Sequence, residues 1–271
     1  MGICGNTLEK SRNKNQIISE QLIDNFIIAE IYIKEDEINK DIRIINSYEE
    51  HLREQLNKEE LITEKMNEKE ITECEIIING ESIPFSYFHK FKNKGYFTIK
   101  YLFNTNLTKT NHMFFNCHSL VNIYQSNFNT EYVTNMEYMF YGCSSVRSIH
   151  IANYKTGNVK NMSHMFCGCS SLKGLDLSNF DTKNVTTMTS MFEDCTSLVC
   201  LDLRNFNTEK VFDMVWMFHN CSSLEFLNIY NFNIQNVIDL SDIFQGCVSL
   251  KNKKNIIAKD RKRIFLQLLY F

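Results

Sequence analysis

A Met-Phe pair recurs along this chain at a constant interval. It begins at residue 113 and returns at 139, 165, 191 and 217, and an Ile-Phe pair follows at 243, so each start lies 26 residues after the last (139 − 113 = 26). A fixed period of this length is the signature of stacked structural repeats. This interval constrains the architecture more than any other feature of the sequence.

The repeats share a template beyond the pair. Residues 172–177 read Leu-x-x-Leu-x-Leu, whose last two leucines alternate as in a short strand, and the apolar residues of 185–192 are spaced by three or four, as in a short helix. One unit cannot bury its own apolar edge, so we expect stacked units to align equivalent side chains into interior rows. Four residues after the first member of each pair comes a cysteine, giving the row Cys117, Cys143, Cys169, Cys195, Cys221 and Cys247.

The full pattern, Cys-x-Ser-Leu-x-x-Leu-Asp-Leu-x-Asn-Phe-x-Thr-x-x-Val-x-x-Met-x-x-Met-Phe, resembles the BspA-like branch of the leucine-rich-repeat family over roughly residues 113–250. It departs from the commoner leucine-rich pattern by placing Phe180 or Phe206 where Asn or Cys is usual. The resemblance implies an α/β fold, a leucine-rich-repeat solenoid with parallel β-strands on one face and short helices on the other. It also implies binding rather than catalysis.

A small β-rich module is expected before the repeats. Residues 27–33 and 96–103 have strand-like composition, and 74–88 predicts a hairpin that turns near Asn79-Gly80. This module would cap the open first unit of the stack, a need that every repeat array has. We therefore expect four regions: a flexible N-terminal segment at 1–24, a capping module at 25–112, the repeats at 113–250 and a C-terminal cap at 251–271.

Two charged segments leave alternatives open. Residues 49–71 predict either a helix or a solvated charged loop within the capping module. Residues 251–263 are basic and precede an apolar run at 264–271, which predicts either a helix closing the last unit or a contact with a membrane or a partner. The apolar run is too short to span a bilayer.

The N-terminus carries a second possibility of membrane contact. Removal of Met1 would expose Gly2 for myristoylation, and Cys4 lies where a second acyl chain would make the attachment firm. The usual acylation pattern has Ser or Thr where this chain has Asn6. The alternative is an ordinary N-terminal segment without lipid.

Charge and cysteine content narrow the function classes. A formal net charge of −3 provides no large positive field, so no nucleic-acid partner is expected. Side chains of the cysteine row point the same way in adjacent units, which does not suit disulfides. No apolar signal segment opens the chain, so we expect free thiols in a cytoplasmic protein.

Two groups of residues suggest a metal: His164 with Cys167 and Cys169, or His219 with Cys221. No second pair stands at zinc-finger spacing, however. No metal and no cofactor are predicted.

No catalytic motif is present in the sequence, and the chain is predicted not to be an enzyme. The carboxylates Asp176 and Asp202 occupy equivalent positions in neighbouring units, where paired acids would support acid–base chemistry. The equivalent position in the other units carries varied residue types, as is expected of an exposed strand face. We predict instead a protein-binding concave face made of Tyr124, His150, Asp176, Asp202, Arg204, Phe226, Asn228 and Tyr230.

Two functions follow from these patterns. The first is a non-enzymatic scaffold that binds an unidentified protein partner in the cytoplasm, at the inner face of a membrane if the N-terminus is acylated. The second is a cell-surface protein or adhesin of the BspA-like type. Passage through a secretory route would allow glycosylation at the Asn-x-Ser/Thr sites that begin at Asn106, Asn161, Asn184 and Asn220.

Overall fold

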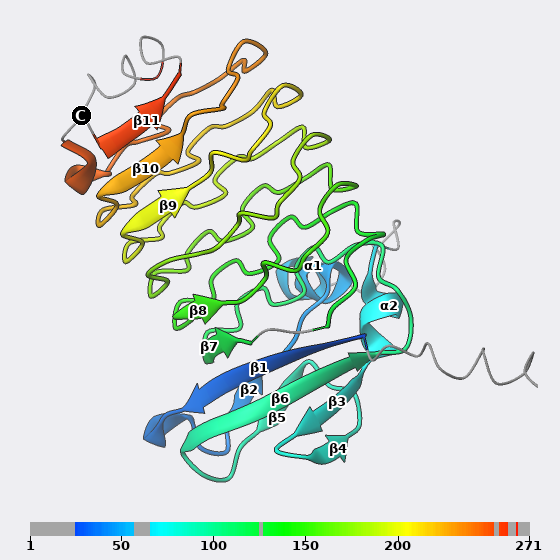
Figure 1. Cartoon of the computed structure of the whole chain (residues 1–271). Helices are drawn as coiled ribbons and strands as arrows, with labels where there is room; N and C mark the ends of the chain where they lie inside the picture. Colours follow the sequence, from blue (N-terminus) through cyan, green and yellow to red (C-terminus); the bar gives the residue numbers. More distant parts are fainter. Residues whose placement is uncertain (1–24, 57–65, 125–126, 252–254, 260–263, 265–271) are drawn as a thin grey trace, which may run out of the picture.

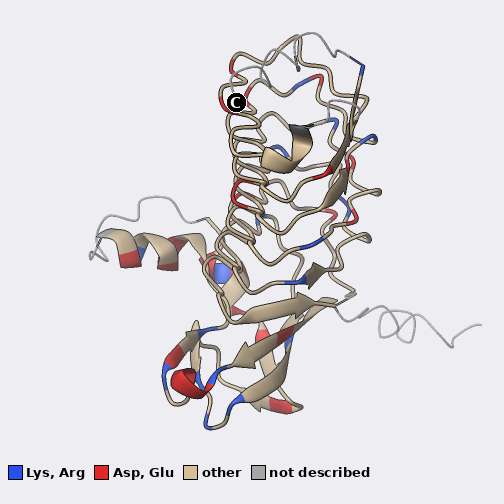
Figure 2. Ribbon diagram, turned by 90° about the vertical axis from the view of Figure 1, so that its left-hand side faces the viewer, with Lys and Arg blue, Asp and Glu red and all other residues tan. Residues whose placement is uncertain are grey.

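The chain forms a β-rich N-terminal module from which a stack of repeat units rises (Figure 1). The computed structural model describes residues 25–56, 66–124, 127–251, 255–259 and 264. The predicted N-terminal segment, most of the C-terminal basic and apolar segments, and the acylation residues Gly2 and Cys4 lie outside these ranges. In Figure 2 acidic and basic positions are interspersed along the molecule.

The N-terminal module is built on an antiparallel sheet. Two long strands, β1 (Asn25–Ile33) and β6 (Gly95–Phe103), pair along their whole length. The predicted hairpin is confirmed, because β3 and β4 flank Asn79 and Gly80, whose φ angles of 50° and 90° give the left-handed turn that suits two-residue hairpins. The smaller elements are η1 (Glu35–Glu37), β2 (Asp41–Arg43), α1 (Tyr48–Leu56), α2 (Glu68–Thr72), β3 (Glu75–Ile78), β4 (Glu81–Ile83) and β5 (Phe88–Lys90).

The charged segment contains both helices of the module. In its described part, Glu49 is buried and accepts hydrogen bonds from the backbone N–H groups of Met66 and Glu68, so it ties the two helices together. Arg53 forms a two-pronged ion pair with Glu68, which raises the pKa of the guanidinium and lowers that of the carboxyl. The helix alternative for this segment is therefore the right one where the structure describes it.

The module covers the open edge of the first repeat. The free edge of β1 pairs antiparallel with β7 (Leu120–Ile123), which pairs in turn with β8 (Ser148–Ile149). One sheet, in the order β4-β3-β6-β1-β7-β8, therefore runs from the module into the repeats. The buried ring of Tyr101 meets Phe114 edge-on at 5.4 Å between centroids. These contacts satisfy the first unit's backbone and apolar edge, which would otherwise face water.

The repeat units stack in register. Backbone N–H groups bond the carbonyl of the equivalent segment in the next unit, as Phe114 does to Met139 at 2.9 Å. Six phenylalanines form a buried row with ring centroids 5.5 to 5.8 Å apart and nearly parallel planes. The row consists of Phe114, Phe140, Phe166, Phe192, Phe218 and Phe244.

The predicted helices of the repeat units do not form, and the predicted α/β leucine-rich-repeat solenoid with helices on one face is wrong. Among the described residues of the repeats the structure has short strands, isolated bridges, turns and one 3₁₀ segment, η3 (Val248–Lys251), but no α-helix. The fold is mostly β-structure, and α1 and α2 belong to the N-terminal module (Figure 1).

Backbone conformation explains why the helical spacing misled. The residue before each Met-Phe pair has a positive φ, as at Tyr138 (55°), and so does the residue three places after the pair begins, as at Gly142 (68°). An α-helix requires negative φ throughout, so two left-handed residues per unit break it into consecutive tight turns. Alternate turn N–H groups then donate to the neighbouring unit, as Phe140 does to Met165, while the N–H groups between them close turns within their own segment, as Tyr141 does to Tyr138.

Interior polar rows bind the units together. Thr182 is 1 % exposed, and its hydroxyl donates to the carbonyl of Asn207 at 2.9 Å and accepts from the N–H of the same residue at 2.8 Å. Thr130, Thr156 and Thr208 make the same pair of hydrogen bonds to the next unit. The cysteine row is similar, since the Cys169 thiol donates to the carbonyl of Phe140 in the preceding unit. The template therefore encodes bonds between units as well as apolar packing.

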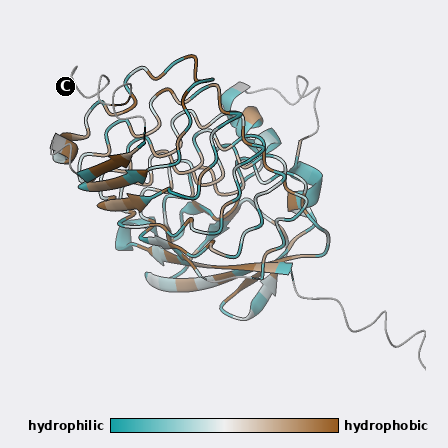
Figure 3. Cartoon of the chain, turned by 45° about the horizontal axis from the view of Figure 1, so that its top comes forward, coloured by the Kyte–Doolittle hydropathy of each residue, from teal (hydrophilic) through white to brown (hydrophobic). Residues whose placement is uncertain are grey.

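The strands of the stack fall into two groups. The first group, β7 and β8 (Ser148–Ile149), continues the sheet of the N-terminal module. The second is a parallel sheet of β9 (Cys200–Asp202), β10 (Phe226–Ile229) and β11 (Ile256–Ala258). In Figure 3 these three strands are largely brown, in agreement with their apolar inward residues. Because β11 pairs with β10, the described part of the predicted C-terminal cap closes the stack with a strand.

Candidate functional site

The predicted binding residues follow one line across the strands. His150, Asp176 and Asp202 recur at 26-residue steps, and Asp202 pairs in register with Asn228 in the ladder of β9 and β10. Leu201, between Cys200 and Asp202, is fully buried, whereas Cys200 is exposed and Asp202 is partly so. This alternation confirms the expected inward and outward sides of the strand.

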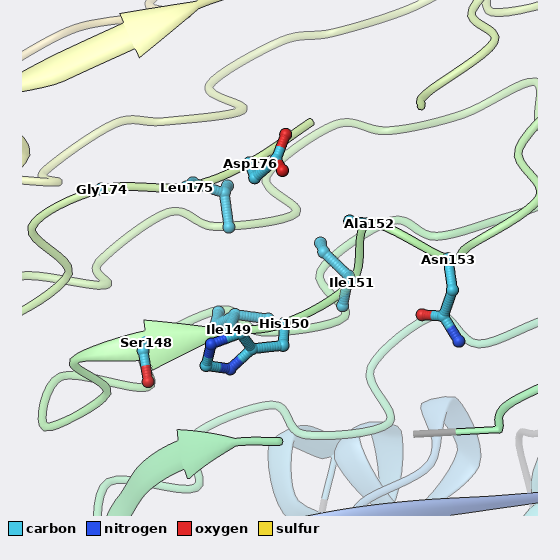
Figure 4. Close-up of a pocket in the computed structure, with 9 residues that line it drawn as sticks. All are labelled: Ser148, Ile149, His150, Ile151, Ala152, Asn153, Gly174, Leu175 and Asp176. Carbon is cyan, nitrogen blue, oxygen red and sulfur yellow. The ribbon is translucent and has the colours of Figure 1, made fainter. Parts of the chain in front are cut away.

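The strand ladder is interrupted in the middle of this face. Among the described residues, no strand pairing joins β8 to the segment 174–177, and that segment meets β9 only through an isolated bridge from Gly174 to Cys200. Glycine lacks a side chain to pack on a sheet and weakens a strand. A groove of about 320 Å³ occupies the interruption, lined by Ser148, Ile149, His150, Ile151, Ala152, Asn153, Gly174, Leu175 and Asp176 (Figure 4).

The groove has an apolar floor and polar walls. Leu175 is half-buried against the core, while His150 and Asp176 are exposed on either side of the gap (Figure 4). The Nδ1 atom of His150 lies 3.0 Å from the carbonyl oxygen of Ile123, which holds the ring against β7. Hydrogen bonds from Ser178 lower the pKa of the Asp176 carboxyl, which is therefore negatively charged at neutral pH.

The other predicted residues lie on both sides of the groove. Arg204 makes an ion pair with Asp202, which lowers the pKa of that carboxyl. Tyr230 is 50 % exposed, and Tyr124 is 37 % exposed near the end of β7. Phe226 is half-buried on β10, and Asn228, predicted to face solvent, is buried and accepts a hydrogen bond from the N–H of Tyr230. The predicted face is therefore present, but Asn228 supports it rather than facing a partner.

The acidic pair does not have the environment of an acid–base couple. Catalytic carboxylate pairs work when one pKa is raised so that this group holds a proton at neutral pH. Asp176 is exposed and Asp202 is partly exposed, and hydrogen bonding lowers the pKa of each. Both are ionised at neutral pH, so the pair offers negative charge and hydrogen-bond acceptors.

The described cysteines of the repeats separate into three environments. The template thiols are free and buried, and burial raises the pKa of Cys143, Cys169 and Cys195 well above the ordinary value. Cys200 is a free, exposed thiol on the predicted binding face. Cys167 points away from the template row toward Glu193, and one ligand atom from each of His164, Cys167 and Glu193 lies within 4.8 Å of the others.

Sequence reasoning missed the groove and found only part of the cluster, because it placed His164 with Cys167 and Cys169 and left out Glu193. The signal for the groove was Gly174, which stands where Ser148, Cys200 and Phe226 carry side chains in the other units. The signal for the cluster was a column two places after the start of each pair, where Cys167, Glu193 and His219 follow one another. The ligand sets suggested by the sequence, His164 with Cys167 and Cys169, and His219 with Cys221, include template cysteines whose thiols instead donate to carbonyls of the preceding unit.

The fold and the sites together define the class of this molecule as a β-rich repeat protein with an exposed strand face. The particular family follows from comparison with family models. The model described as "Mycoplasma protein of unknown function, DUF285" matches residues 86–198 and 168–260, more than half of the chain, and the protein belongs to this family. Neither the curated proteins nor the solved structures include a match. In the part of the chain that the structure describes, no helix has the length and apolar character needed to cross a bilayer.

Proposed function

We propose that this protein is a non-enzymatic scaffold that binds a protein partner through its strand face. The observation that carries the proposal is the groove between β8 and β9, with an apolar floor at Leu175 and exposed aromatic and charged side chains around it. Interfaces between proteins are commonly centred on an apolar pocket with a polar rim.

The size of the groove favours a peptide segment as its occupant. A volume of about 320 Å³ is at the lower limit for small-molecule sites and suits one or two anchoring side chains. The end of the first sheet at β8 adds a strand edge beside the groove. An extended segment can add its backbone to such an edge while alternate side chains enter a pocket.

The charges around the groove favour a segment with a basic residue. Asp176 has no ion-pair partner among the described residues, whereas Asp202 is engaged by Arg204. A lysine or arginine of the partner would therefore meet Asp176 at the groove wall, and an adjacent apolar side chain would reach Leu175.

Cys200 allows a direct test, because its exposed thiol lies on the same face. A benzophenone maleimide is attached to Cys200 in a Cys4→Ser background, and the labelled full chain is illuminated in a lysate of its native cell. We expect one discrete cross-linked product. Tyr230→Ala and His150→Ala should each reduce its yield about tenfold, as loss of a contact worth about 1.4 kcal/mol would.

Two controls make the test specific. Tyr132→Ala removes a tyrosine that is 52 % exposed outside the strands, and it should leave the yield unchanged. A label on Lys210→Cys, introduced in the Cys200→Ser chain, reports a surface away from the strands. Equal trapping from both labels, or full trapping by the Tyr230 and His150 variants, would assign the partner to another surface.

We further propose that the repeats are of the BspA-like type and that the protein is cytoplasmic. The 26-residue repeat motif at 113–250 lies within the residues that the family model matches. The described cysteines are free thiols, which suits a reducing compartment. Two glycosylation candidates are engaged in the stack, since the side-chain amide of Asn184 donates to Gly157 and that of Asn220 to Asp194. A shift in gel mobility on deglycosylation of the native protein would favour the cell-surface alternative.

A further inference from the structure

The turn segments of the stack bring a column of side chains to one side of the molecule. The turn column consists of the residues two places after the start of each pair: Phe115, Tyr141, Cys167, Glu193, His219 and Gln245. Backbone bonds hold consecutive members in register, since the carbonyls of Cys167 and Glu193 accept from Gly142 and Gly168 in the preceding units. The column is aromatic in the first two units and changes to metal-ligating types at Cys167.

Geometry at Cys167 resembles that of a coordination site. The Cys167 sulfur lies 3.6 Å from Glu193 Oε2, and His164 completes a group whose ligand atoms are all within 4.8 Å of one another. A tetrahedral zinc ion, about 2.3 Å from sulfur and about 2.1 Å from oxygen, holds these two atoms about 3.6 Å apart. A small inward movement of the imidazole would bring all three groups to one ion.

Two buried ring nitrogens lack partners at this place. Nδ1 of His164 and Nδ1 of His219 are inaccessible to solvent and have no hydrogen-bond partner. Gln245 Oε1, which can only accept, lies 2.8 Å from Nε2 of His219, so that nitrogen donates and Nδ1 carries a lone pair in the neutral ring. This lone pair faces Glu193 Oε1 at 3.5 Å. Two acceptors in this position repel each other unless a proton or a metal ion lies between them.

The surroundings hold the ligands in place. The ring of His164 stacks on Tyr138 with centroids 4.4 Å apart and planes 3° from parallel. The hydrogen bond between Gln245 and Nε2 of His219 is of the kind that orients a metal-binding imidazole through its other ring nitrogen. His164, Cys167 and Glu193 come from two consecutive units, so an ion at this site would join adjacent layers of the stack.

We propose that His164, Cys167 and Glu193 bind one Zn²⁺ ion, with His219 placed beside Glu193 to complete the coordination. The mixed nitrogen, sulfur and oxygen set is one that zinc accepts, and a thiolate disfavours Mg²⁺ and Ca²⁺. On binding, the sulfur forms a bond to zinc and its proton passes to solvent. The site keeps His164 and Cys167 of the sets suggested by the sequence, adds Glu193, and excludes Cys169 and Cys221.

The test uses Co²⁺ as a spectroscopic substitute for Zn²⁺. The full chain, with Cys4→Ser and Cys200→Ser to remove a thiol outside the described residues and an exposed one, is reduced, freed of metal with a chelator and titrated with Co²⁺. We expect one equivalent to bind with a thiolate-to-cobalt charge-transfer band in the near ultraviolet, and Zn²⁺ to displace it. Cys167→Ser should abolish the band, and His164→Gln and Glu193→Gln should weaken binding at least about tenfold.

The controls separate coordination from folding. Glu209→Gln changes an exposed carboxylate elsewhere in the stack and should bind as the parent does. Circular dichroism and the urea midpoint of each metal-free variant establish that it is folded. The proposal would be overturned if the parent protein showed no thiolate-to-cobalt band. It would also be overturned if folded Cys167 and Glu193 variants bound Co²⁺ as tightly as the parent, and the cluster would then be a set of ordinary hydrogen bonds.

Discussion

Leu201→Ala tests the packing of the stack most directly. Leu201 is fully buried and lies in register with Leu227, which is also fully buried. Truncation removes the transfer free energy of the lost groups and leaves a cavity that two rigid neighbouring units cannot close. Such substitutions cost about 3 to 5 kcal/mol in well-packed interiors.

Leu175→Ala is the matched variant, because it is the same change at the same template position one unit earlier. Leu175 is only half-buried and faces the groove, so water can occupy the vacated space and little cavity remains. We expect a loss of about 1 kcal/mol, from partial transfer alone. Asp202→Ala, on the outward side, should cost less than about 1 kcal/mol, as is usual for surface ion pairs.

Urea unfolding followed by circular dichroism measures all three variants against the parent. Hydrogen exchange adds spatial resolution, because each unit contacts only its neighbours and damage at Leu201 should increase exchange in the units on both sides. Equal losses for Leu175→Ala and Leu201→Ala would refute the argument that the groove relieves packing at Leu175. A large loss for Asp202→Ala would refute the inward and outward assignment of the strand.

Two further predictions concern backbone conformation and acid stability. Gly142→Ala should cost about 1 to 2 kcal/mol in urea unfolding, since φ is +68° and the new Cβ would clash with Asn116 Oδ1. Gly174→Ala, with open space around the site, should be neutral or stabilising, and the same sign for both changes would contradict this reasoning. Arg53 lowers the pKa of Glu68, so their pair contributes stability above the ordinary glutamate pKa of about 4.3, and that stability is lost as the pH falls through the lowered folded value. Arg53→Ala should therefore flatten the acid limb of a stability-against-pH curve, and an unchanged limb would show that the pair is not coupled to folding.

Much of the fold was predictable because side chains at equivalent positions have equivalent surroundings. The alternation at Leu201 and Asp202 and the turn at Asn79-Gly80 follow from local pattern, and the structure confirms both. The helices expected at 185–192 do not form. Their apolar spacing fits tight turns equally well, and the recurring Asn, Asp and Gly just before the template cysteines were the overlooked indication of positive φ.

The candidate sites were less predictable than the fold. Most residues of the proposed face lie on the exposed side of the strands, as their equivalent positions in the repeats predicted. The groove arises because Gly174 and its neighbours do not complete the strand ladder, which depends on pairing between units. The cluster at Cys167 depends on the side of a tight turn from which each side chain projects. Sequence spacing does not specify this direction when left-handed residues interrupt the turn.

The sequence by itself determined the period, the register and the inward rows, because one unit's apolar edge can be buried only against a copy of itself. It also determined the free thiols of the cysteine row, since parallel side chains in adjacent units do not suit disulfide geometry. Only the tertiary structure decided that backbone bonds run between units rather than within helices, that the strand ladder is interrupted at Gly174, and that Cys167 meets Glu193. The physical reason is that these features depend on directions and distances between neighbouring units, which a one-dimensional pattern does not contain.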